Sequence, residues 1–388
     1  MLRILIIFAI ILTAAIILFA GVLYWITKPD STREKSQISD RPDNEENHQI
    51  KAIADNLQLP WELRITDNGV FLFTQKQTGL FKLEEGSTVE IYKPDDLYAR
   101  GEGGMMGLEL VNNFTDSRQL FTCFNSEQNG DYQIIVSKLT LDQNLTAVTN
   151  RQDIITGIPA NVSGRHSGCR LKIDNQNQLW ITTGDAADEA NPQNPDSLGG
   201  KILRTDLDGN PVEGNLNEPF DPRIFSYGHR NTQGIVFLPY SPIYGYGYTS
   251  EHGPNVNDEI NPLLPGNFGW NPGTFYNESV PMTDTARYPE AIEAAWESGN
   301  RTIAASGLVY VVGEQWGEWN DSLLLAALKD SYILRLTINE NGSLTEQEKI
   351  ISGYGRIRQV YQSTKGDLYF ITDNGNNKDI IAQIIPPQ

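Results

Sequence analysis

The chain has 388 residues and a formal net charge of -19, a field that repels nucleic acids and anionic lipids, so neither is an expected partner of the folded body. Apolar residues make up 39% of the chain, which is enough for a large core. The 34 glycines, 16 tyrosines and 7 tryptophans favour β-structure with many tight turns. Two cysteines, Cys123 and Cys169, are too few for a disulfide framework and leave a single bridge open.

The first part of the chain is strongly apolar. Residues 4–26 form an almost unbroken apolar run, and about 20 such residues are enough to cross a bilayer as a helix. Trp25 suits an interfacial anchor, whereas a cleaved signal peptide, the alternative, has a shorter apolar core. We predict a transmembrane helix within residues 1–29, a disordered polar tether over residues 30–49 and a folded body over residues 50–388.

A strand, a polar turn and a second strand that ends in threonine recur along the body. The three copies span residues 63–74, 170–183 and 360–372, and residues 133–139 and 332–337 resemble outer strands of the same unit. Such a degenerate repeat, at roughly 40 to 60 residues per unit, predicts an all-β fold, a six-bladed β-propeller. A seven-bladed ring and an array of β-sandwiches are the alternatives. In a propeller the hairpin loops around the central channel carry the chemistry.

One candidate catalytic pair flanks the second of these hairpins. His166 precedes its first strand and Asp185 follows its second strand. The two side chains can meet on one face of a blade, which gives an imidazole oriented by a carboxylate, as a general base requires. A histidine that only caps a loop is the structural alternative.

Further polar clusters lie at other predicted strand ends. Residues 226–259 contain Arg230 next to Asn231, and later Gly253 next to Pro254, on either side of two short strands. Turns and a solvated arginine explain this stretch equally well. The glycine-rich segment 101–107 predicts a tight turn or a close backbone approach to a ligand, with a flexible loop as the alternative.

A third cluster is basic. It comprises Lys329 and, later, Arg356 and Arg358, whose alternation places both guanidinium groups on one face of a strand. Arginine forks bind carboxylates in a bidentate manner, so the pair suits an anion clamp. Pairing with acidic side chains of this acidic chain is the alternative.

Together these motifs resemble a known family, the soluble-type glucose/sorbosone dehydrogenases that use pyrroloquinoline quinone (PQQ), also called aldose sugar dehydrogenases. The resemblance covers residues 59–384, and it rests on the order of several motifs that are weak alone. These motifs are Gly101-Glu102-Gly103-Gly104, Arg165-His166-Ser167-Gly168, Thr183-Gly184-Asp185, Leu198-Gly199-Gly200-Lys201, Tyr227-Gly228-His229-Arg230-Asn231, Glu251-His252-Gly253-Pro254, Asp258-Glu259 and Arg356-Ile357-Arg358.

The resemblance implies a six-bladed propeller that holds PQQ and Ca²⁺ over the mouth of its channel. By this resemblance His166 is the general base, Asp185 orients it, and Arg230 and Asn231 lie beside the quinone oxygens. The resemblance assigns the remaining positions as follows: the carbonyls of Gly253 and Pro254 to Ca²⁺, and Lys329, Arg356, Arg358, Thr302 and Glu102 to PQQ. Glu102 departs from the glutamine that is usual in the family, and an extra carboxylate there needs a compensating cation or a proton.

The function that the resemblance implies is oxidation of the C1 hydroxyl of aldose sugars to lactones, with hydride transfer to PQQ. A non-catalytic binding propeller and a Ca²⁺-dependent lactonase are the alternatives. The resemblance places the propeller on the periplasmic, extracytoplasmic side of a membrane, although the basic residues on both sides of residues 4–26 leave the orientation of the helix open. A quinone or a cytochrome would accept the electrons, and no residue identifies which.

Overall fold

In the computed structural model, residues 49–84, 86–239 and 246–386 are described. The predicted transmembrane helix within residues 1–29 lies outside these residues, as does the predicted tether except for Gln49. Among the helices of the described segments, none has the length and apolar character needed to span a bilayer.

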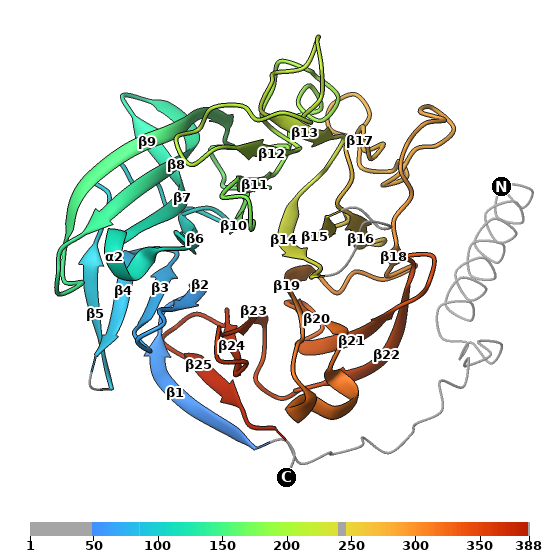
Figure 1. The fold of residues 1–388 in the computed structure, drawn as a ribbon. Helices are drawn as coiled ribbons and strands as arrows, with labels where there is room; N and C mark the ends of the chain where they lie inside the picture. The colour runs from blue at the N-terminus through green and yellow to red at the C-terminus, as the bar shows by residue number, and fades with distance from the viewer. Residues whose placement is uncertain (1–48, 85, 240–245, 387–388) are drawn as a thin grey trace, which may run out of the picture. The chain divides into compact units, whose positions relative to one another are not determined.

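The described chain forms six β-sheets arranged in a ring (Figure 1), which confirms the all-β, six-bladed propeller. Blade 1 contains β2 (Pro60–Ile65), β3 (Phe71–Gln75), β4 (Gly79–Glu84) and β5 (Ser87–Tyr92). Blade 2 contains β6 (Met105–Leu110), β7 (Gln119–Gln128), β8 (Asp131–Leu141) and β9 (Val148–Pro159). Blade 3 contains β10 (Gly168–Ile173), β11 (Leu179–Thr183), β12 (Lys201–Thr205), β13 (Ile224–Tyr227) and β17 (Gly266–Asn267).

The remaining blades complete the ring. Blade 4 contains β14 (Thr232–Phe237), β15 (Gly247–Glu251), β16 (Glu259–Pro262) and β18 (Trp296–Glu297). Blade 5 contains β19 (Ala305–Tyr310), β20 (Ser322–Ala327), β21 (Tyr332–Ile338) and β22 (Leu344–Ile350). Blade 6 contains β23 (Ile357–Gln362), β24 (Leu368–Thr372), β25 (Asp379–Ile384) and, as its outermost strand, β1 (Ile50–Leu57). Two short helices, α2 (Phe114–Ser117) and the 3₁₀-helix η1 (Glu314–Trp319), lie in loops.

Apolar side chains pack between neighbouring blades. Each of the six blade junctions has its own buried apolar cluster, for example around Cys123 and Leu171 between blades 2 and 3. Burying one large apolar side chain contributes about 1.5–3 kcal/mol, so these junctions hold the ring together. By contrast, the first strands of several blades direct polar side chains inward, where Glu62 forms ion pairs with Arg64 and Arg170.

The threonine near the end of the second strand has a structural role in blades 1 and 3. The hydroxyl of Thr74 on β3 donates to the carbonyl of Met106 on β6, at 2.6 Å. Likewise, Thr182 on β11 donates to the carbonyl of Thr232 on β14, at 2.9 Å. A buried carbonyl without a partner is costly, and these hydroxyls supply the donor across the blade junction. In these two copies of the repeat the threonine therefore helps to join one blade to the next, whereas Thr372 in the third copy donates to Asp379 of its own blade.

Every innermost strand is irregular near its start. The pairing of the first strand with the second shifts register in all six blades, for example between Gly168 and Leu171 in blade 3 and between Ile357 and Gln359 in blade 6. A β-bulge redirects the neighbouring side chains and ends regular pairing. In each blade these bulges lie at the end where the first strand begins and the second strand ends, so the side chains on one face of the propeller are the ones that are redirected.

Candidate active site

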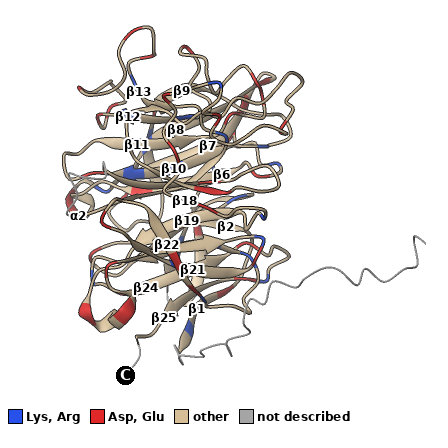
Figure 2. Ribbon diagram, turned by 90° about the vertical axis from the view of Figure 1, so that its right-hand side faces the viewer, with Lys and Arg blue, Asp and Glu red and all other residues tan. Residues whose placement is uncertain are grey.

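The predicted site residues lie on this face of the propeller. One group immediately precedes first strands, and it comprises Glu102, His166, Arg230, Asn231, Thr302 and Arg356. The other group follows second strands, and it contains the predicted Asp185 and Lys329 together with Lys76, His252 and Asp373, which the sequence did not single out. Because first strands begin where second strands end, the two groups converge around one end of the channel. In the side view of Figure 2, acidic residues are dispersed over several blades rather than gathered in one segment.

His166 and Asp185 meet as the sequence predicted. The Nδ1 of His166 lies 2.8 Å from an Oδ1 of Asp185, and the two residues are 3% and 0% exposed. The same oxygen of Asp185 accepts the backbone N–H of Ala187 at 2.8 Å. His166 has a φ of 52°, a left-handed conformation that is uncommon for a residue other than glycine. The imidazole is thus oriented by a buried carboxylate, and its catalytic role stays a prediction.

Glu102 fixes the backbone beside this pair. Its Oε2 accepts the backbone N–H of His166 at 3.1 Å and the side-chain N–H of Asn231 at 2.9 Å. The Oδ1 of Asn231 in turn accepts the backbone N–H of Gly168 at 3.1 Å. These bonds join the loops of blades 2, 3 and 4. They also offset the negative charge of Glu102, and the cation Lys76 lies within electrostatic reach of that carboxylate.

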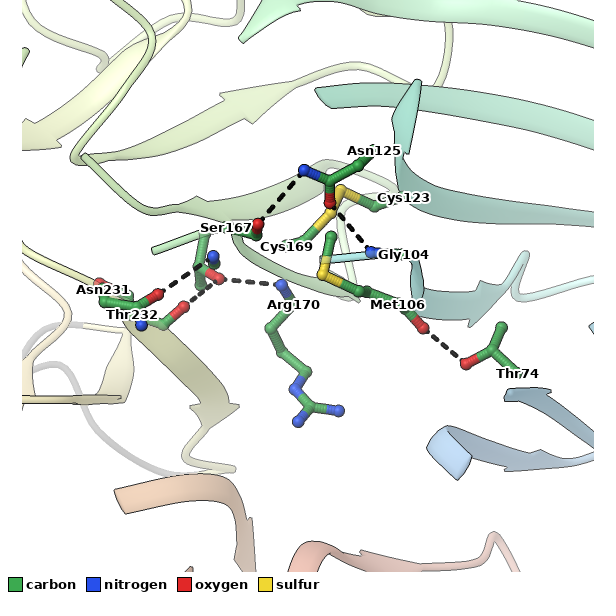
Figure 3. The surroundings of a disulfide bond; sticks show 12 residues. Thr74, Gly104, Met106, Cys123, Asn125, Ser167, Cys169, Arg170, Asn231 and Thr232 are labelled. Carbon is green, nitrogen blue, oxygen red and sulfur yellow. Dashed lines mark hydrogen bonds between the residues drawn. A yellow bond between two sulfur atoms is a disulfide. The ribbon is translucent and has the colours of Figure 1, made fainter. Parts of the chain in front are cut away.

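A disulfide bond holds the other end of the same segment (Figure 3). Cys123 on β7 is bonded to Cys169 on β10, with the two Cα atoms 5.7 Å apart, and both cysteines are fully buried. Between Cys169 and His166, the hydroxyl of Ser167 accepts a hydrogen bond from Asn125 at 3.3 Å. The single bridge that the sequence left open is therefore formed, and it lies three residues from the candidate base.

Arg230 is held by acids and a carbonyl. Its guanidinium donates to Glu278 through Nε at 3.0 Å and through Nη2 at 2.5 Å, and Nη1 donates to the carbonyl of His252 at 2.9 Å. Glu278 belongs to the connection between β17 and β18, which the sequence did not associate with the site. The backbone N–H of Arg230 donates to buried Glu251, which also accepts from His229. The arginine is therefore fixed by Glu278 and by the carbonyl of His252.

Cations gather at the junction of blades 6 and 1. Arg358 is buried on β23 and forms an ion pair with Asp373, while Lys76 and Arg356 each lie 3.9 Å from the same carboxylate. Arg356 immediately precedes β23, so it is not within the strand as the alternation implied, although both guanidinium groups do reach one acid. Burial raises the pKa of Asp373, and the charges of Arg358 and Lys76 outweigh it, so the net pKa is lowered.

One cation of the predicted basic cluster stands apart. Lys329 follows β20 and is exposed, and its backbone N–H donates to the carbonyl of Ile303 at 2.9 Å.

The three cations around Asp373 nevertheless exceed its single negative charge, and the Nε of Arg358 has no hydrogen-bond partner within the described residues. Hydrogen-bond donors are therefore in surplus at this junction, while Glu102 and Asp379 also act electrostatically on Arg356.

Thr302 and Gly253 are linked through a buried acid. The hydroxyl of Thr302 donates to Asp258 at 3.0 Å, and Asp258 also accepts the backbone N–H groups of Gly253 at 2.9 Å and Ile303 at 2.7 Å. This carboxylate is occupied by donors and holds the 253–258 loop. Within the described segments no three His, Cys, Asp or Glu side chains cluster as metal ligands, so a cation at Gly253 and Pro254 requires backbone oxygens.

Comparison with known sequences places the chain in a family. The signature of the Glucose / Sorbosone dehydrogenase family matches residues 57–382, nearly the whole described body. The chain belongs to this family. The matched region contains every site residue predicted from the sequence, so the resemblance drawn from the motifs is confirmed at the level of the family.

Individual relatives of this dehydrogenase family are distant. The aldose sugar dehydrogenase YliI of Escherichia coli (strain K12) is 29% identical over 346 residues, which cover 85% of this chain and 91% of that protein. The quinoprotein glucose dehydrogenase B of Acinetobacter calcoaceticus is 25% identical over 332 residues, covering 76% of this chain and 67% of that protein. The crystal structure of the soluble aldose sugar dehydrogenase from Escherichia coli in its apo-form superposes with a TM-score of 0.76 at 26% identity, covering 87% of this chain and 99% of that one.

Several residues of the site escaped prediction. Lys76, His252 and Asp373 follow second strands at the position where Asp185 follows β11, so the repeat register carried a signal for them. Tyr276 and Glu278 lie in the long β17–β18 connection, which has no periodic pattern. The sequence repeat could therefore locate the first group, whereas only the folded chain locates the second.

Proposed function

We propose that this member of the glucose/sorbosone dehydrogenase family is a PQQ-dependent aldose dehydrogenase that oxidises the C1 hydroxyl of sugars to lactones. The observation that carries the proposal is the imidazole of His166, oriented by Asp185, at the same end of the channel as the cations around Asp373. A base and an anion subsite on one face suit the oxidation of an alcohol by an anionic cofactor.

The donors around the channel mouth fit an anionic, multi-carboxylate cofactor such as PQQ. Lys76, Arg356 and Arg358 gather around the carboxylate of Asp373, and charge-assisted hydrogen bonds to carboxylates are the strong ones. The buried Nε2 of His252 has no hydrogen-bond partner within the described residues. Burial, assisted by the charges of Arg358 and Arg230, holds the pKa of His252 well below its usual value, so this imidazole is neutral. It offers a polar atom to a ligand without adding charge.

In the proposed reaction, His166, Asp185 and Arg230 have distinct roles. His166 donates through Nδ1–H to Asp185, which leaves the Nε2 lone pair available to take the proton of the C1 hydroxyl. PQQ, when bound, would supply the two-electron acceptor for the hydride of C1. Arg230, fixed by Glu278 and by the carbonyl of His252, presents positive charge next to the base. Because these groups are positioned before substrate arrives, little reorganisation accompanies the proton transfer.

A divalent cation is the second cofactor that we propose. Ca²⁺ prefers oxygen ligands, including backbone carbonyls, and Gly253 and Pro254 lie in the loop that Asp258 holds against the start of β19. Those two carbonyl groups would hold Ca²⁺ beside the cofactor. Thr302 would support that loop through Asp258, rather than serve as an independent ligand.

We also propose that the propeller functions outside the cytoplasm, anchored through residues 1–29. The buried Cys123–Cys169 disulfide supports this location, because structural disulfides persist mainly in oxidising compartments and are rare in the cytosol. The electrons would then leave through a quinone or a cytochrome. A sugar and a membrane are accordingly the proposed partners.

The proposal is tested with the purified full-length chain in detergent. The protein is titrated with PQQ and CaCl₂, a panel of aldoses is added, and the quinone absorbance and dye reduction are followed. Tight binding with sugar-dependent bleaching is the expected result. Binding without turnover on any sugar, or no binding of PQQ, contradicts the proposed activity and favours a binding propeller of the same fold.

A further inference from the structure

The connection between β17 and β18 supplies two aromatic donors to the acid of the candidate base pair. The hydroxyl of Tyr276 donates to Oδ2 of Asp185 at 2.6 Å, and the indole N–H of Trp270 donates to the same oxygen at 2.8 Å. The Tyr276 oxygen also lies 2.9 Å from Nδ1 of His166. Tyr276 therefore touches both members of the pair.

The backbone around Tyr276 is held in an unfavourable conformation. Phe275 and Tyr276 have φ values of 60° and 55°, both left-handed, and such conformations cost of order 1–3 kcal/mol each. Paired backbone hydrogen bonds of 2.9 Å between Gly273 and Asn277 close the loop. Phe275 is 93% exposed, so its own packing does not account for the strain.

A second set of contacts, made by Arg165, holds the loop that carries Tyr276 next to His166 and Asp185. The guanidinium of Arg165 lies 5.5 Å from the centre of the Tyr276 ring, and it also forms an ion pair with Glu278 at 3.4 Å. Glu278 in turn binds Arg230. The loop is thus held at the ring of Tyr276 and at Glu278, and these contacts help to keep the hydroxyl on Asp185.

The carboxylate of Asp185 is shared among four donors. Oδ1 receives His166 and the backbone of Ala187, while Oδ2 receives Tyr276 and Trp270. Each donor withdraws charge from the carboxylate, so each weakens the interaction of Asp185 with a protonated His166. Burial, followed by the charge of Asp185, raises the pKa of Tyr276, so its hydroxyl keeps its proton and remains a donor.

We propose that Tyr276 is a positioning residue that sets the basicity of His166 through the shared carboxylate of Asp185. The inference rests on the proposed role of His166 as the base. Without the hydroxyl, Asp185 interacts more strongly with the imidazolium form, and His166 holds its proton to higher pH. Tyr276 thereby limits how strongly Asp185 stabilises the protonated form of His166.

The other charged groups around the pair stay in place when the hydroxyl is removed. The carboxylate of Glu102, in the loop that precedes blade 2, accepts a hydrogen bond from the backbone N–H of His166. Lys201 acts on Asp185 electrostatically from β12, while its ammonium donates to the carbonyls of Asn191 and Gly199 at 2.7 Å. The remaining charged neighbours approach from the loops of blades 3 and 4, and they are Arg165, Arg230 and Glu278; the neutral imidazole of His252 lies there too. None of these groups bonds to the hydroxyl of Tyr276.

The test compares Tyr276→Phe with Tyr288→Phe in the full-length protein. Tyr288 lies in the same connection, and its hydroxyl contacts Asn271 rather than the pair. The imidazole resonance of His166, assigned with His166→Gln among only four histidines, is titrated by NMR without cofactor. In Tyr276→Phe the midpoint is expected to rise by about 0.5 to 1 unit, and the acid limb of the pH–turnover profile should move with it. Tyr288→Phe should leave both unchanged.

The outcomes separate the inference from the proposed function. An unchanged midpoint, or a loss of turnover at all pH values without a shift, overturns the positioning role and leaves only a structural one. If the unmodified protein oxidises no sugar, the proposed function is wrong. The NMR titration would still test whether the Tyr276 hydroxyl affects His166 through Asp185. If Tyr276→Phe does not fold, Trp270→Phe removes the other donor to Oδ2, and the same upward shift is expected. No shift there overturns the inference.

Discussion

The two halves of the channel mouth are organised differently. On the side of blade 3, His166 is held by a carboxylate with four donors, by Glu102 and by a disulfide three residues away. On the side of blades 6 and 1, three cations share Asp373, and Arg356 remains 46% exposed. In the first half, the polar side chains are hydrogen-bonded to one another. In the second half, hydrogen-bond donors outnumber their acceptors.

This difference indicates how the two halves would meet their ligands. A base must be correctly oriented before the reaction, because reorientation during proton transfer adds to the barrier. A subsite for an anion needs free donors, and charges that are already fully paired would have to be separated before binding. The structure therefore separates rigid positioning from ligand capture within one ring of loops.

The largest expected effect comes from removing the base itself. His166→Ala should lower sugar turnover by about 10²–10⁴-fold, the usual contribution of a general base, while PQQ affinity stays within a few-fold because the cations around Asp373 are untouched. Single-turnover kinetics and a spectroscopic PQQ titration measure the two quantities. Turnover close to that of the unmodified protein would remove His166 from this role.

Removing the disulfide tests whether this bond holds the first half of the channel mouth rigid. Replacing Cys123 and Cys169 together with alanine should lower the free energy of unfolding by about 2–4 kcal/mol. Turnover should fall more than PQQ affinity, because Cys169 lies in the segment that carries His166. Chemical denaturation and PQQ titration measure these changes, with unmodified protein in reductant as the comparison. An equal loss of both properties would mean that the two halves are not separable.

The smallest expected effect tests the surplus cations. Arg356→Gln should weaken PQQ binding by about 1.5–3 kcal/mol, the range for a hydrogen bond to a charged group, while unfolding is little affected because Arg356 is half-exposed. Equilibrium titration with PQQ provides the measurement. Arg223→Gln is the control, since Arg223 is paired with Asp221 in another loop. Unchanged PQQ affinity in Arg356→Gln would exclude the arginine from the anion subsite.

Much of this organisation could be predicted from local sequence. The hairpin repeats predicted the blades because each strand pair is built from contiguous residues, and the positions of His166 and Asp185 at the two ends of one hairpin predicted their contact. Asp373 occupies the equivalent position after β24, yet an isolated acid carries no sign of its cationic partners until blades 6 and 1 are joined by ring closure.

Other features depend on tertiary structure alone. The pairing of Cys123 with Cys169 requires β7 and β10 to be adjacent, which two cysteines in a sequence do not reveal. Tyr276 reaches Asp185 from an irregular connection, where neither period-2 alternation nor turn motifs indicate direction. Arg356 was placed within a strand because alternation does not show where a strand begins.

The closure of the ring by β1 has a consequence for the order of the chain. Because β1 pairs with β25, the backbone N–H of Ile385 donates to the carbonyl of Gln49 at 2.9 Å, and the two ends of the described body lie side by side. A few added residues could join them, and the chain could be opened instead at the exposed Asn129–Gly130 turn between β7 and β8. A circularly permuted propeller would keep every blade junction and both halves of the channel mouth. The first blade in the sequence therefore has no privileged place in the fold.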